Sequence, residues 1–165
     1  MKLSLALVAL VLVAGPVSAH EVWSGRDFYF EKPPYVNHTL PQNQDRITDA
    51  VWITRGNSMG IFNFAQESGY TSFVSPVDTE WATGDAADWQ SLTFQTWENW
   101  NGRFPPGMVG LNAVVHLISD DIYLDIRFES WTILGAGGGF SYYRAGPGPV
   151  STEASTWGRI KGLYR

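Results

Sequence analysis

The segment from Ser119 to Trp131, SDDIYLDIRFESW, combines two kinds of residue at the spacing of a β-strand. Because successive side chains of a strand point to opposite faces, alternate positions share a face. One set predicts a face buried in the core: Ile122, Leu124, Ile126 and Phe128. The other set places an aromatic or charged residue at every second position: Tyr123, Asp125, Arg127, Glu129 and Trp131.

The second set has the chemistry of a carbohydrate-binding surface. Aromatic planes stack on sugar rings, and carboxylates or guanidinium groups form paired hydrogen bonds with hydroxyls. We therefore predict that these five residues form one ligand-binding face. The alternative is a solvated sheet face on which Asp125, Arg127 and Glu129 form surface ion pairs that contribute little to stability.

The acidic residues also allow an enzymatic interpretation. Two carboxylates across a cleft hydrolyse glycosidic bonds, and their separation decides between retention and inversion. The sequence offers Glu80, Glu98, Asp125 and Glu129, but spacing along the chain selects no pair. It contains no G-x-S-x-G motif, no cysteine and no glycine-rich phosphate loop followed by a helix. We assign no catalytic residue.

A copper site is a further alternative. An N-terminal histidine can bind copper through its amine and its ring, as in the lytic polysaccharide monooxygenases. His20 would begin the chain after removal of residues 1–19, with His116 as its partner and His38 as the remaining histidine. The flanking sequence does not resemble that enzyme group, and the ligands are too few for a firm assignment.

A calcium site would need hard oxygen ligands. The turn at Asp120 and Asp121, together with Asp45 and Asp49, contains such oxygens. The spaced acidic loop of an EF-hand is not present in the sequence, and aspartate in turns usually serves local hydrogen bonding. We expect neither a metal nor another cofactor.

These residues need a β-sheet around them. Short aromatic and β-branched runs alternate with Gly, Pro, Asn and Asp turns, which is typical of an all-β chain. We predict a single antiparallel β-sandwich of jelly-roll type. The strands 112–119 and 121–131 should form a hairpin at the centre of the sheet. The other predicted strands are 27–31, 49–55, 60–65, 70–76, 91–97 and 140–145, with a loop at 78–89.

The ends of the chain indicate segments outside this domain. Residues 1–19 combine a basic start, an apolar stretch and a small-residue cleavage site, as a Sec-type secretory signal peptide does. We assign 20–145 to the sandwich, 146–155 to a Pro/Gly linker and 156–165 to a short amphipathic tail. The tail, TWGRIKGLYR, is interpreted either as a docked or frayed end, or as a sorting signal.

Composition restricts the partners. After residue 19, ten basic residues stand against sixteen acidic ones without a basic cluster, which argues against nucleic acid and anionic lipid. No second apolar run follows the first, so we expect no transmembrane segment in the mature chain. The chain contains no cysteine, and an exported domain without disulfides depends on its core alone.

Four segments together resemble a group of exported bacterial β-rich domains: NQDRITDAVWITRGNSMGIFNFAQE, SPVDTEWATG, PPGMVGLNAVVHLISDDIYLDIRFESW and GGGFSYYR. The resemblance covers most of residues 22–144. It implies secretion or surface display, often with a C-terminal sorting or anchoring segment. The group has no assigned activity, so no catalytic residue follows from it. This chain departs from the group in lacking a hydrophobic C-terminal anchor.

Together these features predict a secreted or surface-displayed bacterial domain without catalysis, which binds glycan or extracellular matrix material. A first alternative is a structural cell-envelope component whose Trp-rich loops, TEWATGDAADW and TWENWNG, pack between subunits. A second is a polysaccharide-active enzyme, either a glycoside hydrolase or a copper oxygenase. The sequence predicts no oligomeric state.

Overall fold

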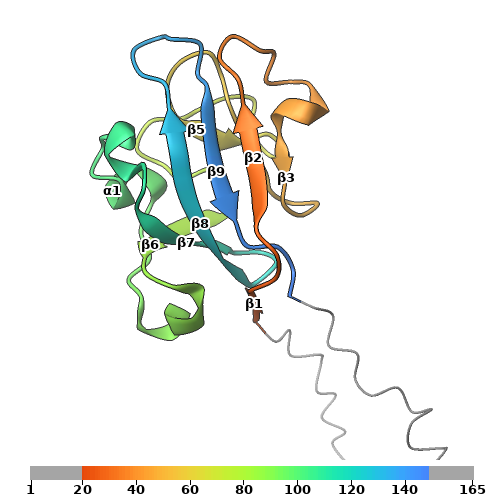
Figure 1. The fold of residues 1–165 in the computed structure, drawn as a ribbon, viewed down its shortest axis with the longest axis vertical. Coiled ribbons are helices and arrows are strands. Elements are labelled where there is room, and N and C mark those ends of the chain that lie inside the picture. Colours follow the sequence, from red (N-terminus) through yellow and green to blue (C-terminus); the bar gives the residue numbers. More distant parts are fainter. Residues whose placement is uncertain (1–19, 149–165) are drawn as a thin grey trace, which may run out of the picture.

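The computed structural model describes residues 20–148 as two β-sheets that pack face to face. In Figure 1, strands β2, β9 and β8 of the larger sheet run side by side in front, and β5 of the smaller sheet lies behind them. The predicted all-β sandwich is confirmed. The predicted signal peptide, the predicted tail and most of the predicted linker lie outside the described residues.

The larger sheet has six strands in the order β2-β9-β8-β7-β6, with β1 paired to β8. Strands β6 to β9 follow one another as an antiparallel meander, so the jelly-roll topology is not confirmed. The strands are β1 Glu21–Trp23, β2 Phe28–Lys32, β6 Thr79–Thr83, β7 Asn112–Leu117, β8 Ile122–Trp131 and β9 Phe140–Arg144.

Strand β8 organises this sheet because it has three partners. Strand β7 pairs along one side as the predicted hairpin, and β9 pairs with the second half of the other side. The first half of that side pairs with β1, and this pairing is parallel. The predicted antiparallel sandwich is confirmed, and β1–β8 is the one parallel pairing among the strands of residues 20–148.

The smaller sheet has the order β3-β4-β5, with β3 Asp45–Arg46, β4 Trp52–Arg55 and β5 Ile61–Asn63. The predicted core face of β8 is confirmed, because Ile122, Leu124, Ile126 and Phe128 are all buried. They pack against Ile53 of the smaller sheet in one continuous hydrophobic core.

A buried charge cluster ties the two sheets together. Asp45 of β3 is 3% exposed and accepts hydrogen bonds from Arg144 of β9, from Nε at 2.6 Å and from Nη2 at 2.9 Å. The Tyr142 hydroxyl donates to the same carboxylate at 2.7 Å. Burial and the adjacent Asp45 charge raise the pKa of Tyr142 well above its ordinary value. Because a buried charge needs a partner, this bidentate pair fixes how β3 lies on β9.

Three predicted elements are wrong. Residues 70–76 form no strand, since Phe73 adopts φ +68°, a left-handed conformation incompatible with a continuous strand. Residues 91–97 contribute a single bridge from Gln95 to Trp81, and Thr96 then caps the short helix α1, Trp97–Trp100. The predicted loop 78–89 contains β6, the edge strand of the larger sheet.

Short helical segments cover the edges of the sandwich. They are η1 Pro41–Asn43, η2 Ala86–Ser91, α1 and η3 Pro105–Met108. Of the helices between residues 20 and 148, none has the length and hydropathy needed to span a membrane.

Candidate functional site

A β-bulge divides the predicted ligand-binding face. Up to Phe128 the pairing of β8 with β9 is regular, but Glu129 has no partner and Trp131 lies opposite Phe140. Directly opposed residues share a face of the sheet, and Phe140 is buried in the core. Trp131 therefore lies on the core face, so the prediction that it shares a face with Asp125 and Arg127 is wrong.

Tyr123, at the start of β8, is covered by other aromatic residues. Its ring stacks on His116 with centroids 4.0 Å apart and on Trp89 of η2 with centroids 4.3 Å apart. Phe94 packs against it edge to face at 5.7 Å. Tyr123 is 7% exposed, so it cannot offer its ring to a sugar as predicted.

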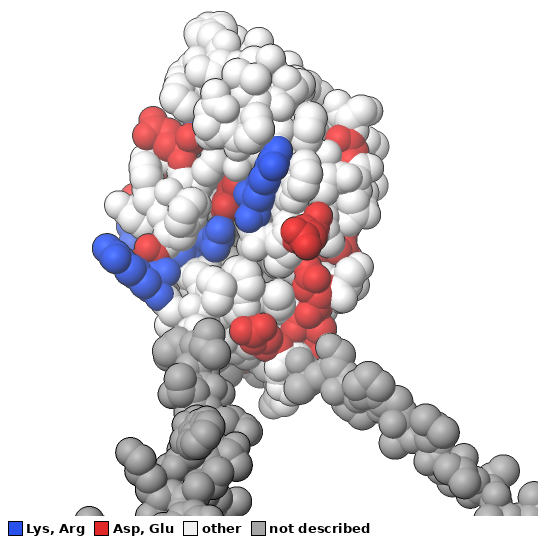
Figure 2. All heavy atoms as spheres, turned by 90° about the vertical axis from the view of Figure 1, so that its right-hand side faces the viewer, with Lys and Arg blue, Asp and Glu red and all other residues white. Residues whose placement is uncertain are grey.

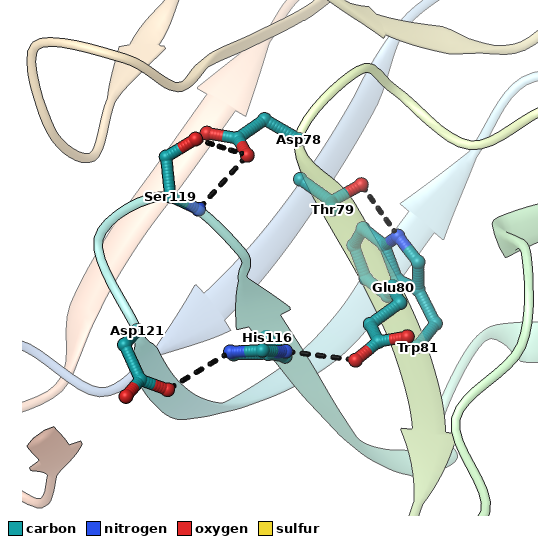
Figure 3. Close-up of polar contacts among 7 residues, drawn as sticks. All are labelled: Asp78, Thr79, Glu80, Trp81, His116, Ser119 and Asp121. Carbon is teal, nitrogen blue, oxygen red and sulfur yellow. Dashed lines mark hydrogen bonds and ion pairs between the residues drawn. The ribbon is translucent and has the colours of Figure 1, made fainter. Parts of the chain in front are cut away.

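The polar network around His116 is shown in Figure 3. Its Nδ1 lies 2.8 Å from Oε1 of Glu80, and its Nε2 lies 3.3 Å from Oδ1 of Asp121. A neutral imidazole donates from one nitrogen only, whereas the protonated ring donates from both. The nearby Ser119 hydroxyl donates to Asp78 at 2.7 Å and makes no hydrogen bond with the histidine. The cluster thus joins β6 to the β7–β8 turn without forming a nucleophile–base pair.

The copper ligands are not brought together. His20 packs against Trp89 with ring centroids 4.6 Å apart, and Trp89 in turn stacks on Tyr123. Two aromatic rings therefore stand in series between His20 and His116. Across residues 20–148, the structure contains no group of three or more His, Cys, Asp or Glu side chains that could hold a metal ion.

The calcium alternative also finds no common site. Asp121 contacts His116, whereas Asp45 is engaged by Arg144 between the two sheets. The other two acidic residues, Asp49 and Asp120, are exposed. The four residues therefore have separate surroundings.

The three charged residues of the predicted face stay together. Asp125, Arg127 and Glu129 line a groove of about 690 Å³ beside β8 and β9. Arg127 Nε lies 3.3 Å from Glu129 Oε1, in an exposed ion pair of small energetic value. Asp125 Oδ1 instead accepts the backbone N–H of Ala86 at 2.8 Å and so anchors η2.

Burial is the main cause that raises the pKa of Asp125, and the negative charges of Asp85 and Asp27 add to it. The hydrogen bond from Ala86 acts in the opposite direction. The groove thus concentrates negative charge, because Asp27 and Asp85 line it as well.

Exposed tyrosines flank this groove. Tyr143 of β9 lies opposite Arg127 on one side and opposite Tyr29 of β2 on the other. The two tyrosine rings have centroids 4.9 Å apart, and each residue is about half exposed. We call the surface made by Tyr29, Tyr143, Arg127 and the acidic groove the open sheet face.

The carboxylates considered for glycoside hydrolysis do not converge. Glu80 contacts His116, and Asp125 and Glu129 line the open sheet face. Glu98 lies in a different groove, where it is the only acidic residue. The geometry therefore gives Glu98 no second carboxylate for a hydrolytic pair.

That second groove, of about 800 Å³, has a more aromatic lining than the acidic groove. It lies between the end of β8, α1 and the loops that flank them, on the α1 side of the molecule in Figure 1. We call it the aromatic groove. Its aromatic lining consists of Tyr70, Phe73, Trp97, Phe104 and Trp131. Phe73 and Phe104 are 64% and 63% exposed, so their rings are available to a ligand.

Glu98 and Arg103 are two of the polar residues that line the aromatic groove, together with Arg55, Ser58 and Ser72. Glu98 is 6% exposed, and its Oε2 accepts the backbone N–H of Phe73 at 2.8 Å. Within the part of the chain that the structure describes, its Oε1 makes no hydrogen bond and the residue forms no ion pair. The Arg103 guanidinium lies over the Phe73 ring at 5.2 Å. The groove thus combines aromatic walls with a carboxylate that accepts hydrogen bonds and a guanidinium that donates them.

Two buried cations hold the loop that forms one wall of this groove. Arg55 donates to the carbonyls of Thr132 and Gly139, both at 3.1 Å, and Lys32 Nζ donates to that of Gly138 at 3.2 Å. Burial lowers the pKa of Arg55 to about 10. Burial and the neighbouring Arg55 charge together lower the pKa of Lys32. The Arg55 guanidinium also lies 3.6 Å from the ring centroid of Trp131, which fixes the indole.

Most of this groove was not predicted from the sequence. Phe73 was expected in a strand, and Phe104 and Arg103 were assigned no role because they lie in turns without a regular pattern. The signal that could have found them is the aromatic content of these turns. An aromatic residue in a Gly- or Pro-rich turn has no strand or helix face through which to reach the core.

The tryptophans of the two loops considered for subunit packing pack against their own domain. Trp81, Trp97 and Trp100 are buried within the domain itself. Trp89 is partly buried against Tyr123. These residues are part of the hydrophobic packing and present no tryptophan surface to a neighbouring subunit.

In comparisons with protein-family models, curated proteins and solved structures, the chain matches none of them.

Proposed function

We propose that this protein is a secreted or surface-displayed domain that binds glycan in the aromatic groove without catalysing a reaction. The observation that carries the proposal is the joint presence of exposed aromatic rings, an arginine and a buried carboxylate in one concave surface. Sugar-binding sites need flat apolar surfaces for the ring faces and directed polar groups for the hydroxyls.

The polar groups suit a neutral, hydroxyl-rich ligand. A sugar hydroxyl can donate to the open Oε1 of Glu98 and accept from Arg103, so both groups gain a partner. A purely apolar ligand would desolvate Glu98 Oε1 without giving it a hydrogen-bond partner, which costs free energy. A glycan is therefore favoured over a lipid or another apolar molecule.

The same groove supports binding in preference to hydrolysis. Glu98 is the only carboxylate that lines it, whereas glycoside hydrolases of the common type use two. The secreted location is proposed from residues 1–19, which have the sequence of a signal peptide. A glycan ligand agrees with that location.

The experiment is a glycan-array screen followed by calorimetry on each hit, with the wild type and two variants. Phe104→Ala removes an exposed ring from the aromatic groove, and we expect about five- to thirtyfold weaker binding, since one stacking contact contributes about 1–2 kcal/mol. Tyr143→Ala removes a ring of similar exposure from the open sheet face and is the matched control, with unchanged affinity expected.

Loss in Tyr143→Ala alone would move the site to the open sheet face, and equal loss in both variants would contradict a site confined to the aromatic groove. Silence across a broad array, with and without calcium, would favour the structural envelope role. Turnover of a polysaccharide by the wild type would contradict the proposed absence of catalysis, and loss of that turnover in Glu98→Gln would contradict the assignment of Glu98 as a binding group only.

A further inference from the structure

The described chain ends beside the open sheet face. After β9, Gly146 accepts a hydrogen bond from Gly25 N–H at 3.1 Å, and Pro147 lines a small depression together with Asp27 and Tyr29. Asp27 also lines the acidic groove of the open sheet face. Any segment that follows residue 148 therefore starts next to this groove.

The charges of the two parts of the chain are complementary. Residues 149–165 contain three basic residues and one acidic residue, whereas residues 20–148 contain seven basic and fifteen acidic residues. Of those seven, Arg144 lines the acidic groove but is already paired with Asp45. Arg127 is thus the one basic residue of this groove that projects into solvent, against four carboxylates: Asp27, Asp85, Asp125 and Glu129.

The aromatic residues are complementary as well. The tail carries Trp157 and Tyr164 on either side of Arg159 and Lys161, and the open sheet face carries the half-exposed Tyr29 and Tyr143. Nine residues from 149 to 157 span up to about 30 Å when extended, which is ample for a return to an adjacent groove. Tyrosine and tryptophan rings gain from mutual packing and from cations placed over them.

We propose that the C-terminal segment 157–165 docks on the open sheet face of its own domain. Its basic side chains Arg159, Lys161 and Arg165 lie along the acidic groove, and Trp157 packs against Tyr29 and Tyr143. The docked segment would be hidden from a sorting or attachment partner until that partner displaces it. This inference concerns a different surface from the aromatic groove and does not depend on glycan binding.

The lysine content of the chain makes a specific cross-linking test available. Its three lysines are Lys2, Lys32 and Lys161, and Lys32 is fully buried. A carbodiimide joins a lysine amine to a carboxylate in direct contact, so in the full-length chain products of Lys161 report where the tail lies. Peptide mass spectrometry separates them from products of Lys2.

We expect monomeric products that join Lys161 to Asp27, Asp85, Asp125 or Glu129. The double variant Arg159→Glu, Arg165→Glu keeps the linking residues and Lys161 but reverses two charges of the tail, and should lower the yield of these products about tenfold. Screening by 0.5 M salt should lower the yield of the wild type in the same way. Asp49→Asn changes an exposed carboxylate outside the groove and should leave the yield unchanged. Lys161→Arg should abolish these products.

Other outcomes overturn the proposal. Acidic side chains lie at several separate places on the face drawn in Figure 2, so products spread over carboxylates outside the groove would show a tail without a fixed site. Products found only between two chains, or none from Lys161, would exclude docking on its own domain. An unchanged yield in the charge-reversed variant would show that Lys161 reaches the groove only because the tail is covalently attached nearby, and not because the tail binds there.

Discussion

The two ends of strand β8 each carry a large aromatic residue, and the fold uses them differently. At the start, Tyr123 lies on the outer face of the sheet and is nevertheless buried, between His116 and Trp89. At the end, Trp131 lies on the core face and nevertheless lines a solvent-filled groove. The face of a strand thus fails to predict exposure at both ends.

The difference comes from what covers each end. Segment 86–95 folds over the outer face at Tyr123, anchored by the hydrogen bond from Ala86 to Asp125. At the other end, the turns that carry Phe73 and Phe104 flank the space in front of Trp131 without filling it. The contrast between a covered aromatic and an accessible one gives four predictions, ordered by their expected effect on stability.

The largest effect should come from Tyr123→Ala. The substitution removes a buried ring from a stack, and we expect a loss of about 3–4 kcal/mol in the free energy of unfolding. Urea titration followed by tryptophan fluorescence measures it. A loss below about 1 kcal/mol would show that Tyr123 is not covered as the structure has it, and would restore it as a surface residue.

His116→Ala tests the polar side of the same stack. It removes a ring in contact with Tyr123 and leaves Glu80 and Asp121 without their shared partner, so a loss of about 2 kcal/mol is expected. The same urea titration provides the value. The comparison variant is His38→Ala, which removes a partly buried histidine that has no such pair of carboxylates. An equal loss of stability in His38→Ala would show that the contacts of His116 with Glu80 and Asp121 add nothing beyond the loss of a ring.

Asp125 tests what holds the cover in place. Asp125→Ala removes the acceptor for Ala86 N–H and should cost about 1 kcal/mol, whereas Asp125→Asn keeps an acceptor oxygen and removes the charge. Because the pKa of Asp125 is raised in the fold, its stabilising contribution is present below pH 3.8 and is lost as the pH rises through the folded value.

Asp125→Asn should therefore gain stability relative to the wild type when the pH is raised from about 3 to 7. Urea titrations at the two pH values give this difference directly. A relative loss at pH 7 would mean that the ionised carboxylate stabilises the fold, contrary to the effect of its burial and its acidic neighbours.

The smallest effect on stability should come from Phe104→Ala, at the open end of β8. An exposed ring outside the core contributes within about 0.5 kcal/mol to folding, although it is a wall of the aromatic groove. Thermal unfolding and glycan binding, measured on the same variant, separate the contribution of Phe104 to stability from its contribution to binding. A loss near that of Tyr123→Ala would place Phe104 in the core and remove it from the binding site.

The sequence was sufficient to predict the parts of the fold that depend on periodicity. The hairpin 112–131, its buried face and the strands near 28–32, 52–55, 61–63 and 140–144 all follow from alternating patterns and turn residues. Strand β6 was missed because Glu80 and Thr83 interrupt its apolar residues at an edge of the sheet.

The candidate site was predictable only in part. Asp125, Arg127 and Glu129 do share a groove, since they depend on regular alternation. The position of Trp131 depends on a bulge, and the burial of Tyr123 depends on a segment more than thirty residues earlier in the chain. Neither a one-residue irregularity nor a long-range cover leaves a periodic signal in the strand itself.

The unpaired Glu129 also affects how this domain is compared with others. One residue fewer between Phe128 and Trp131 would restore regular pairing and leave the tryptophan opposite Phe140, on the core face. A protein with nearly the same sequence but without Glu129 would therefore keep the tryptophan in its aromatic groove and lose one carboxylate of the acidic groove. A single-residue gap at this position therefore preserves the aromatic groove, although strict alternation counted from Phe128 would assign the tryptophan to different faces in the two sequences.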